Sequence, residues 1–375
     1  MNRIEELKAI SANPKKELKN TIAAGKKVVG ILPYFCPEEL VYAAGMMPFG
    51  LWGAMIQVNE SKRYFPAFIC SLLHTTLEMG IKGELDDLSA VMIPICCDSL
   101  KGMGANWEFG VGKKVPVINV AYAENRKIKA GIEFTASQFR KIRKQLEEIA
   151  GLKITDEAIT DAIKIYNENR RAIMQFSDVA ATHPKEISLQ TRSAIIRAGY
   201  FMDRAEHTKA LLEICEELKA VPTSEEGYIK IVTTGILADM PQLLEIMEKN
   251  NMVITCDQVA HESVNARYEV PETEDPIEGM AQRLADIEGC SVLFDPEKKR
   301  GQQLIQMAKE TKADGILFVL TKFCDPEEYD YVPVKRMTDL ADIPMLQIEI
   351  DQQMTNFAQA ESAVQAFSEM LKDTI

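Results

Sequence analysis

The sequence lacks an excess of basic residues. Lys and Arg together number 43, against 56 Asp and Glu, and the formal net charge is −13. A chain this acidic repels the phosphate backbone, so its charge disfavours sequence-independent binding to nucleic acid. No basic patch with interleaved aromatic residues reverses this conclusion.

Long apolar runs are missing too. The first twenty residues, MNRIEELKAISANPKKELKN, are charged throughout, and we expect no signal peptide. No apolar segment approaches the roughly 20 residues needed to cross a bilayer. We therefore expect a cytoplasmic protein with no membrane partner. In that compartment the eight cysteines should be core residues, metal ligands or redox groups rather than structural disulfides.

Several short motifs are also absent. No two cysteines have the C-x-x-C spacing that zinc ribbons, thioredoxin-type proteins and two-cluster ferredoxins require. The sequence contains no H-E-x-x-H, no G-x-S-x-G and no P-loop frame. These absences leave no familiar zinc, serine-hydrolase or nucleotide-phosphate site.

What is present is an alternation of apolar runs and helical segments, which predicts parallel sheets with right-handed crossovers. For 375 residues, two domains are the natural division. We predict an α/β fold with two Rossmann-like parallel-sheet domains, residues 1–130 and 221–375, joined by a helical connecting region over 131–220. The predicted strands cover residues 26–33, 90–95, 115–120, 229–233, 252–256, 291–294, 315–320 and 344–348. The predicted helices include residues 4–24, 38–47, 65–80, 131–177 with a break at 151–155, 188–218, 240–250, 277–287, 297–311 and 356–372.

The chain is organised around Ala90 to Gly104, AVMIPICCDSLKGMG. This pattern predicts a buried strand, a turn that carries two cysteines, and the start of a helix. The design recurs at GILFVL followed by TKFCDPEEYD, where Asp325 is the predicted N-cap and Pro326 the first helical residue. The N–H groups and dipole at a helix start stabilise a thiolate and lower its pKa. Cys97 and Cys324 are therefore candidate metal or redox cysteines.

Three further cysteines have positions that could carry chemistry. Cys36 and Cys256 also end predicted strands, and Cys70 falls on a predicted apolar helix. Free cysteine most often packs as a small buried hydrophobe, which is our interpretation of Cys215 and Cys290. From the spacings alone, an iron–sulfur site between two domains and simple packing both stay open.

Taken together, three segments resemble the 2-hydroxyacyl-CoA dehydratases, a family that shares a superfamily with ATP-dependent benzoyl-CoA reductases. They are YFCPEELVYAAGMMP near the start, ICCDS after Cys70, and KFCDPEEYD near the end. Their order and separations match over nearly the whole chain. The segment TCDQVAHESVNARYEV departs from the pattern of many members, so we assign no function to Cys256 or Asp257.

The resemblance implies a heterodimer of two homologous subunits, each with a [4Fe–4S] cluster on three cysteines at a domain interface. Carried over by motif, the ligands here are Cys70, Cys97 and Cys324, and the fourth iron position is filled by something other than a cysteine of this chain. The length matches the smaller (beta) subunit, whose cluster relays electrons. Acyl-CoA would then bind mainly to the larger (alpha) subunit, and an ATP-dependent activator protein would donate the electron.

The chemistry implied is removal of water from an (R)-2-hydroxyacyl-CoA, such as 2-hydroxyisocaproyl-CoA, to give the (E)-2-enoyl-CoA. One low-potential electron converts the thioester to a ketyl radical, and this makes the otherwise non-acidic β-hydrogen removable. Two alternatives stay open: a subunit of a benzoyl-CoA reductase-type enzyme, and a non-catalytic structural partner whose cysteines all belong to the core. Cys36 is a further residue that could lie near the cluster.

Overall fold

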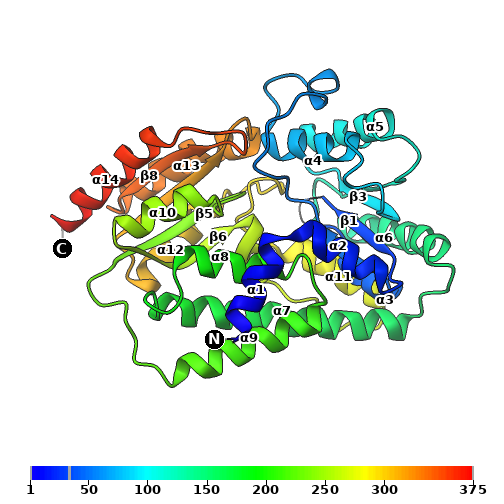
Figure 1. The fold of residues 1–375 in the computed structure, drawn as a ribbon, viewed down its shortest axis with the longest axis horizontal. Helices are drawn as coiled ribbons and strands as arrows, with labels where there is room; N and C mark the ends of the chain where they lie inside the picture. Colours follow the sequence, from blue (N-terminus) through cyan, green and yellow to red (C-terminus); the bar gives the residue numbers. More distant parts are fainter. Residues whose placement is uncertain (1, 33–34, 374–375) are drawn as a thin grey trace.

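Two four-stranded sheets, one in each half of the chain, form the frame of the computed structural model, which describes residues 2–32 and 35–373 (Figure 1). Every neighbouring pair of strands is parallel. The α/β prediction with two parallel sheets is thus confirmed. The first sheet has the order β2 (Met47–Gly50), β1 (Val28–Ile31), β3 (Ala90–Pro94), β4 (Val117–Val120), and the second β6 (Met252–Val259), β5 (Ile229–Gly235), β7 (Gly315–Thr321), β8 (Met345–Ile350).

Helices cover these sheets. Because both faces of a parallel sheet are covered, its central strands are apolar on both sides, and every residue of β3 and β7 is buried. The helices of the first half are α1 (Asn2–Ala12), α2 (Pro14–Ala23), α3 (Glu38–Ala43), α4 (Ser71–Ile81), α5 (Asp98–Gly110) and α6 (Lys129–Ala150). Those of the second half are α10 (Pro241–Lys249), α11 (Pro276–Asp286), α12 (Arg300–Thr311), α13 (Asp325–Leu340) and α14 (Ala358–Lys372).

Three helices lie between the two halves in sequence: α7 (Asp156–Thr182), α8 (Leu189–Ala198) and α9 (Arg204–Lys219). The longest, α7, runs across the lower part of Figure 1 and packs against α3 of the first half and β6 of the second. Its predicted N-cap is confirmed, because the hydroxyl oxygen of Thr155 accepts a hydrogen bond from the Ala158 N–H at 3.2 Å. Domain limits at residues 130 and 220 stay a prediction.

One apolar core joins the two sheets. Its buried members include Val91 and Ile93 from β3, Ile231 from β5 and Val319 from β7. The two halves are therefore packed against each other through a continuous hydrophobic cluster. Within residues 2–32 and 35–373, no helix is both long and apolar enough to cross a membrane.

Two predicted elements are wrong. The helix expected to reach Met47 ends at Ala43, because Gly45 turns the chain with a φ of 70° and Met47–Gly50 pairs with β1 as a strand. This strand lies at the sheet edge, where its proline is tolerated. The strand expected at residues 291–294 is a turn. There the Phe294 carbonyl accepts a hydrogen bond from Arg126 of the first half instead of from a neighbouring strand.

Some predicted boundaries also move. The strand expected to end at Cys256 continues to Val259, since Arg192 pairs with the Asp257 carboxylate and makes its burial tolerable. The predicted N-cap of the helix near Asp325 shifts by one residue to Cys324, while Pro326 lies in the first turn as expected. The last residue of the strand predicted over 26–33 lies outside the described residues. Short helical turns occur at η1 (Ser61–Arg63) and at η2, a π-helix over Ala260–Val264.

Candidate functional site

The three candidate ligand cysteines all stand at helix N-termini. Cys97 ends the turn after β3 and caps α5, and Cys324 follows β7 and caps α13. Both positions were predicted from sequence. Cys70 was expected within a helix, but its extended backbone places it one residue before α4, as the N-cap. All three side chains are partly buried and free of disulfides.

Sheet topology explains why Cys97 and Cys324 occupy such positions. In each sheet the strand order reverses between the first and third strands, β1 and β3 or β5 and β7. Ligands of open α/β sheets bind beyond the carboxyl ends of strands at such a reversal. Cys97 follows β3 and Cys324 follows β7, so each half presents one cysteine at its own switch point.

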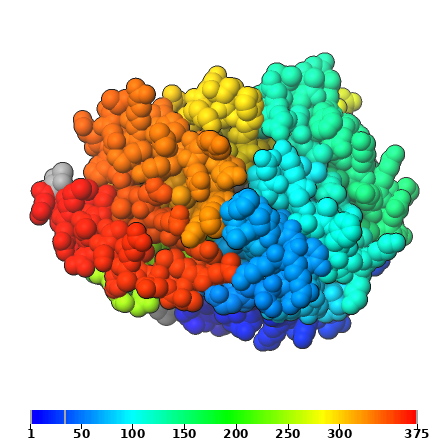
Figure 2. All heavy atoms as spheres, turned by 90° about the horizontal axis from the view of Figure 1, so that it is seen from above, coloured from blue at the N-terminus to red at the C-terminus, as the bar shows by residue number. Residues whose placement is uncertain are grey.

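The three cysteines converge although they come from distant parts of the chain. Cys97 raises the pKa of Cys70, and both Cys70 and Cys97 raise that of Cys324. The carboxylate of Asp325 raises the pKa of Cys70 and Cys97 as well. Because such effects weaken with distance, they indicate that the three thiols lie in one region of the fold. On the upper face, segments around residues 60 (blue) and 100 (cyan) meet the orange segment around residue 320 along one seam (Figure 2).

The thiol pKa values differ from the expectation. Burial raises the pKa of Cys70 to about 12, and burial is also the main cause of the raised pKa values of Cys97 and Cys324. Backbone N–H groups near each sulfur, such as those of Leu72 and Leu73 at Cys70, oppose the effect without overcoming it. A helix N-terminus alone therefore does not make these groups thiolates. A bound cationic centre would, because coordination displaces the thiol proton.

The chemistry of this donor set is compatible with an iron–sulfur group. Among the described residues, no three His, Cys, Asp or Glu side chains lie close enough together to hold one ion. Three cysteines near backbone N–H groups, at a seam between two halves, are the soft and partly shielded ligands that iron–sulfur centres use. Cys70, Cys97 and Cys324 would hold that group.

Residues of the second half fix the start of α4. The Ser71 hydroxyl oxygen accepts a hydrogen bond from the Gln352 N–H at 3.0 Å, and Thr75 donates to Gln352 Oε1 at 2.8 Å. Gln352 also donates from Nε2 to the Trp52 carbonyl at 2.7 Å. A Cβ on Gly53 would lie 2.2 Å from Gln352 Oε1, so only glycine fits there. Cys70 is thus held in place across the seam.

A buried ion pair supports the start of α13. Arg300 donates from Nη1 to Glu327 at 2.7 Å and from Nη2 at 3.2 Å, and the Ser291 hydroxyl donates to Glu327 at 2.5 Å. Arg300 also donates to Thr234 at 2.8 Å and lies 4.8 Å from the centre of the Phe318 ring. These contacts tie the first turn after Cys324 to α12 and β5.

Two other cysteines have partners of their own. The Cys36 thiol is buried 3.8 Å from the Leu32 carbonyl oxygen, and burial holds its pKa well above the ordinary value. Cys256 accepts a hydrogen bond from Arg267 at 3.1 Å. Cys36 raises the pKa of Cys96, the residue before Cys97, and its proximity to the three cysteines stays a prediction.

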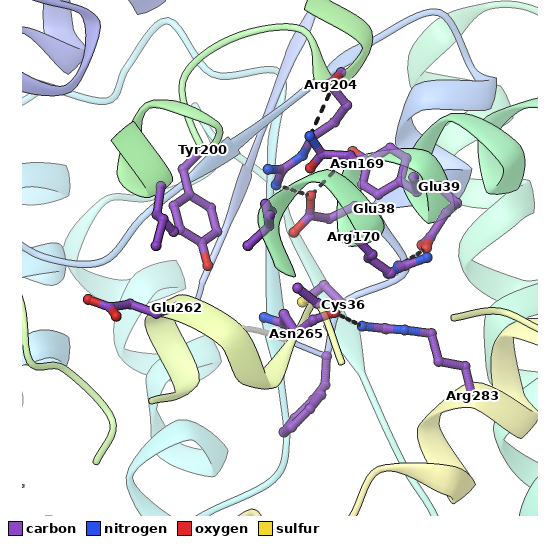
Figure 3. A pocket seen from close by; sticks show the side chains of 15 residues that line it. Cys36, Glu38, Glu39, Asn169, Arg170, Tyr200, Arg204, Glu262, Asn265 and Arg283 are labelled. Carbon is purple, nitrogen blue, oxygen red and sulfur yellow. Dashed lines mark hydrogen bonds and ion pairs between the residues drawn. The ribbon is translucent and has the colours of Figure 1, made fainter. Parts of the chain in front are cut away.

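Sequence reasoning missed a second site, a charged cavity of about 50 Å³ (Figure 3). It opens after the carboxyl end of β1 and is lined by the loop to α3 and by α7, α9, η2 and α11. Two ion pairs lie in its wall: Arg204 with Glu38 at 2.8 Å, and Arg170 with Glu39. No motif could reveal it, because its arginines come from helices far apart in the chain.

Known proteins match this chain along almost its full length. A family model described as "2-hydroxyglutaryl-CoA dehydratase, D-component" matches residues 33–371. The (R)-phenyllactyl-CoA dehydratase beta subunit of Clostridium sporogenes is 48% identical, over 98% of each chain. The beta subunit of (R)-2-hydroxyglutaryl-CoA dehydratase of Acidaminococcus fermentans is 39% identical, also over 98% of each. A subunit of the benzoyl-CoA reductase of Thauera aromatica is 25% identical, over 80% of this chain and 79% of its own. The chain therefore belongs to the 2-hydroxyglutaryl-CoA dehydratase D-component family of dehydratase subunits.

Proposed function

We propose that this chain is the beta subunit of a cytoplasmic (R)-2-hydroxyacyl-CoA dehydratase and relays an electron through a [4Fe–4S] cluster on Cys70, Cys97 and Cys324. The observation that carries the proposal is that three cysteines from two halves of the chain occupy helix N-cap positions and that their thiols influence one another electrostatically. Relatives named as beta subunits support an alpha partner. We assign the electron donor to an ATP-dependent activator protein.

When bound, the cluster would supply one low-potential electron to a thioester on the partner subunit, where a ketyl radical would allow water to leave. The residues of this chain hold and shield that group. Backbone N–H groups at the three helix starts stabilise negative charge on the sulfurs, which influences the reduction potential. Gln352 holds the first turn of α4 in place, and the Arg300–Glu327 pair holds the first turn of α13.

Iron and acid-labile sulfide content of the chain, purified without oxygen, tests the cluster. We expect four irons and four sulfides per chain of the wild type, as a [4Fe–4S] centre contains, and a sharp loss in Cys97→Ala. Absence of iron from both proteins, with the partner subunit present, would refute the cluster. That result would favour the alternative of a structural subunit whose cysteines are packed in the core.

A benzoyl-CoA reductase-type activity is the second candidate, favoured by the 25% identity to a benzoyl-CoA reductase subunit. Product analysis on the assembled enzyme separates the two reactions. Dehydration is redox-neutral overall and yields one enoyl-CoA for each hydroxyacyl-CoA consumed. Reduction consumes electrons in proportion to product.

A further inference from the structure

The charged cavity beside Cys36 contains a buried cation without an anionic partner. Arg283, on α11, is about nine-tenths buried and lines the cavity. Its Nε donates to the Tyr268 carbonyl at 2.8 Å and its Nη2 to the Asn265 carbonyl at 2.7 Å. Among the described residues it forms no ion pair within 4.0 Å and no hydrogen bond from Nη1. The remaining N–H groups of this guanidinium are available to a ligand.

Every carboxylate of the cavity wall is already committed to another arginine. Glu38 pairs with Arg204, Glu39 with Arg170, and Glu262 with Arg192. Glu38 and Glu39 attract Arg283 only from longer range. Burial, together with repulsion by Arg170, lowers the pKa of Arg283 to about 9. Because buried charges are normally paired, Arg283 is the one cation of this cavity, among the residues described, that needs a counter-ion.

Arg126 shows what a purely structural buried arginine does in the same fold. It is also buried, and all three of its nitrogens donate to backbone carbonyls, those of Leu284, Ile287 and Phe294. Arg283 satisfies only two of its nitrogens in this way and directs the rest of its guanidinium toward the space beside Cys36 and Asn265 (Figure 3). The arrangement of Arg283 therefore suits the binding of an anionic ligand better than the support of backbone carbonyls alone.

The size of the cavity limits the ligand. One water needs about 10–15 Å³ of such space, so the volume of about 50 Å³ has room for roughly four waters or an ion of about four heavy atoms. A guanidinium fork matches a planar carboxylate through two parallel hydrogen bonds. Tyr200, Asn265 and Ala266 also line the space, so a short apolar end could be accommodated beside polar groups.

We propose that this cavity binds a small carboxylate ion of about acetate size, with Arg283 as its principal ligand. The site is distinct from the three cysteines and does not rest on the proposed dehydratase function.

Titration calorimetry of the full chain with sodium acetate, against sodium chloride at equal ionic strength, tests the proposal. Arg283→Met removes the cation and keeps the bulk of the side chain, and Ala266→Val fills the cavity without changing any charge. Arg171→Met is the matched control, because Arg171 lies on α7 but pairs with Glu269 at the surface. Circular dichroism in chloride verifies that each variant is folded.

We expect saturable binding of one acetate per chain in the wild type and in Arg171→Met. Dissociation constants in Arg283→Met and Ala266→Val should rise by about tenfold or more, as expected for loss of a charge-assisted hydrogen bond. If Arg283→Met fails to fold, Ala266→Val alone decides. Absence of saturable acetate binding in the wild type, unchanged binding in Ala266→Val, or tighter binding of inorganic phosphate than of acetate would each overturn the proposal.

Discussion

The backbone N–H of Gln352 donates a hydrogen bond to the hydroxyl oxygen of Ser71 at 3.0 Å. Gln352 follows β8 in the second half of the chain, whereas Ser71 immediately follows Cys70 in the first. The position of this cysteine therefore depends on a contact between residues separated by 281 positions in sequence. A substitution that weakens the contacts between the two halves should therefore change the position of Cys70.

Gln352→Leu should destabilise the chain by about 1–3 kcal/mol, because it removes the buried hydrogen bonds that the side chain makes with the Trp52 carbonyl and the Thr75 hydroxyl. Urea unfolding followed by circular dichroism measures the change. Gln365→Leu is the control, since Gln365 is exposed on α14 and its side chain bonds to Glu369. Equal midpoints for both variants would show that the Gln352 contacts do not stabilise the seam.

Glu327→Leu should be more costly, by about 3–5 kcal/mol, because Arg300 would remain buried beside Asp330 without its main partner. The double variant Arg300→Met with Glu327→Leu should recover much of that loss, since it removes the buried charge as well. Chemical unfolding of the two variants and the wild type compares these values. A double variant less stable than Glu327→Leu would contradict the explanation.

The free energy of unfolding should depend on pH because of the Glu262 carboxyl group. Burial, with a smaller contribution from Asp257 and Asp239, raises the Glu262 pKa to about 7 despite the attraction of Arg192. The folded state therefore binds more protons than the unfolded state between pH 4.5 and 7, and stability from this group is lost as pH rises through that window.

Glu262→Gln should therefore lose less stability than the wild type as the pH rises from about 4.5 to 7, because glutamine cannot ionise. Unfolding midpoints at several pH values across that range measure the difference. Because His207 and His261 are present in both proteins, the comparison isolates Glu262. A difference that stays constant with pH would show that the carboxyl group is not shifted upward.

Cys215→Ala is the matched control for the cysteine site. Cys215 is fully buried on α9 within an apolar cluster, away from the three converging cysteines. We expect Cys215→Ala to retain the iron content of the wild type and to lose roughly 1 kcal/mol of stability through packing. Cys324→Ala should instead lose iron. Parallel loss of iron from both variants would mean that the metal content reports only general damage.

The sequence predicts the frame of this fold well, because its main signals are local. Runs such as GILFVL at β7 are apolar throughout since both faces of the sheet are covered. Cys97 and Cys324 could be placed between a strand and a helix for the same reason. The signals for the end of a strand and the start of a helix both lie within a few residues of sequence. The edge strand at Met47–Gly50 was missed because it is short and contains a proline.

Relations between distant residues were not predictable in this way. The placement of Cys70 in the same region as Cys324 depends on how the halves pack, and only the resemblance to a family indicated it. The cavity around Arg283 could not be assembled from the sequence, since Tyr166, Arg170 and Arg204 are unremarkable side chains in their own segments. Tertiary packing alone turns them into one polar wall.

The two sheets share one strand order, 2-1-3-4 in the first half and its equivalent 6-5-7-8 in the second. Under this correspondence Cys97, before the helix that follows β3, matches Cys324, before the helix that follows β7. Cys70 precedes the helix leading into β3, and its counterpart before α12 is Lys299. The approximate twofold repetition of the frame therefore breaks at Cys70. A four-iron group held as proposed would have one of its corners filled from outside the repeat.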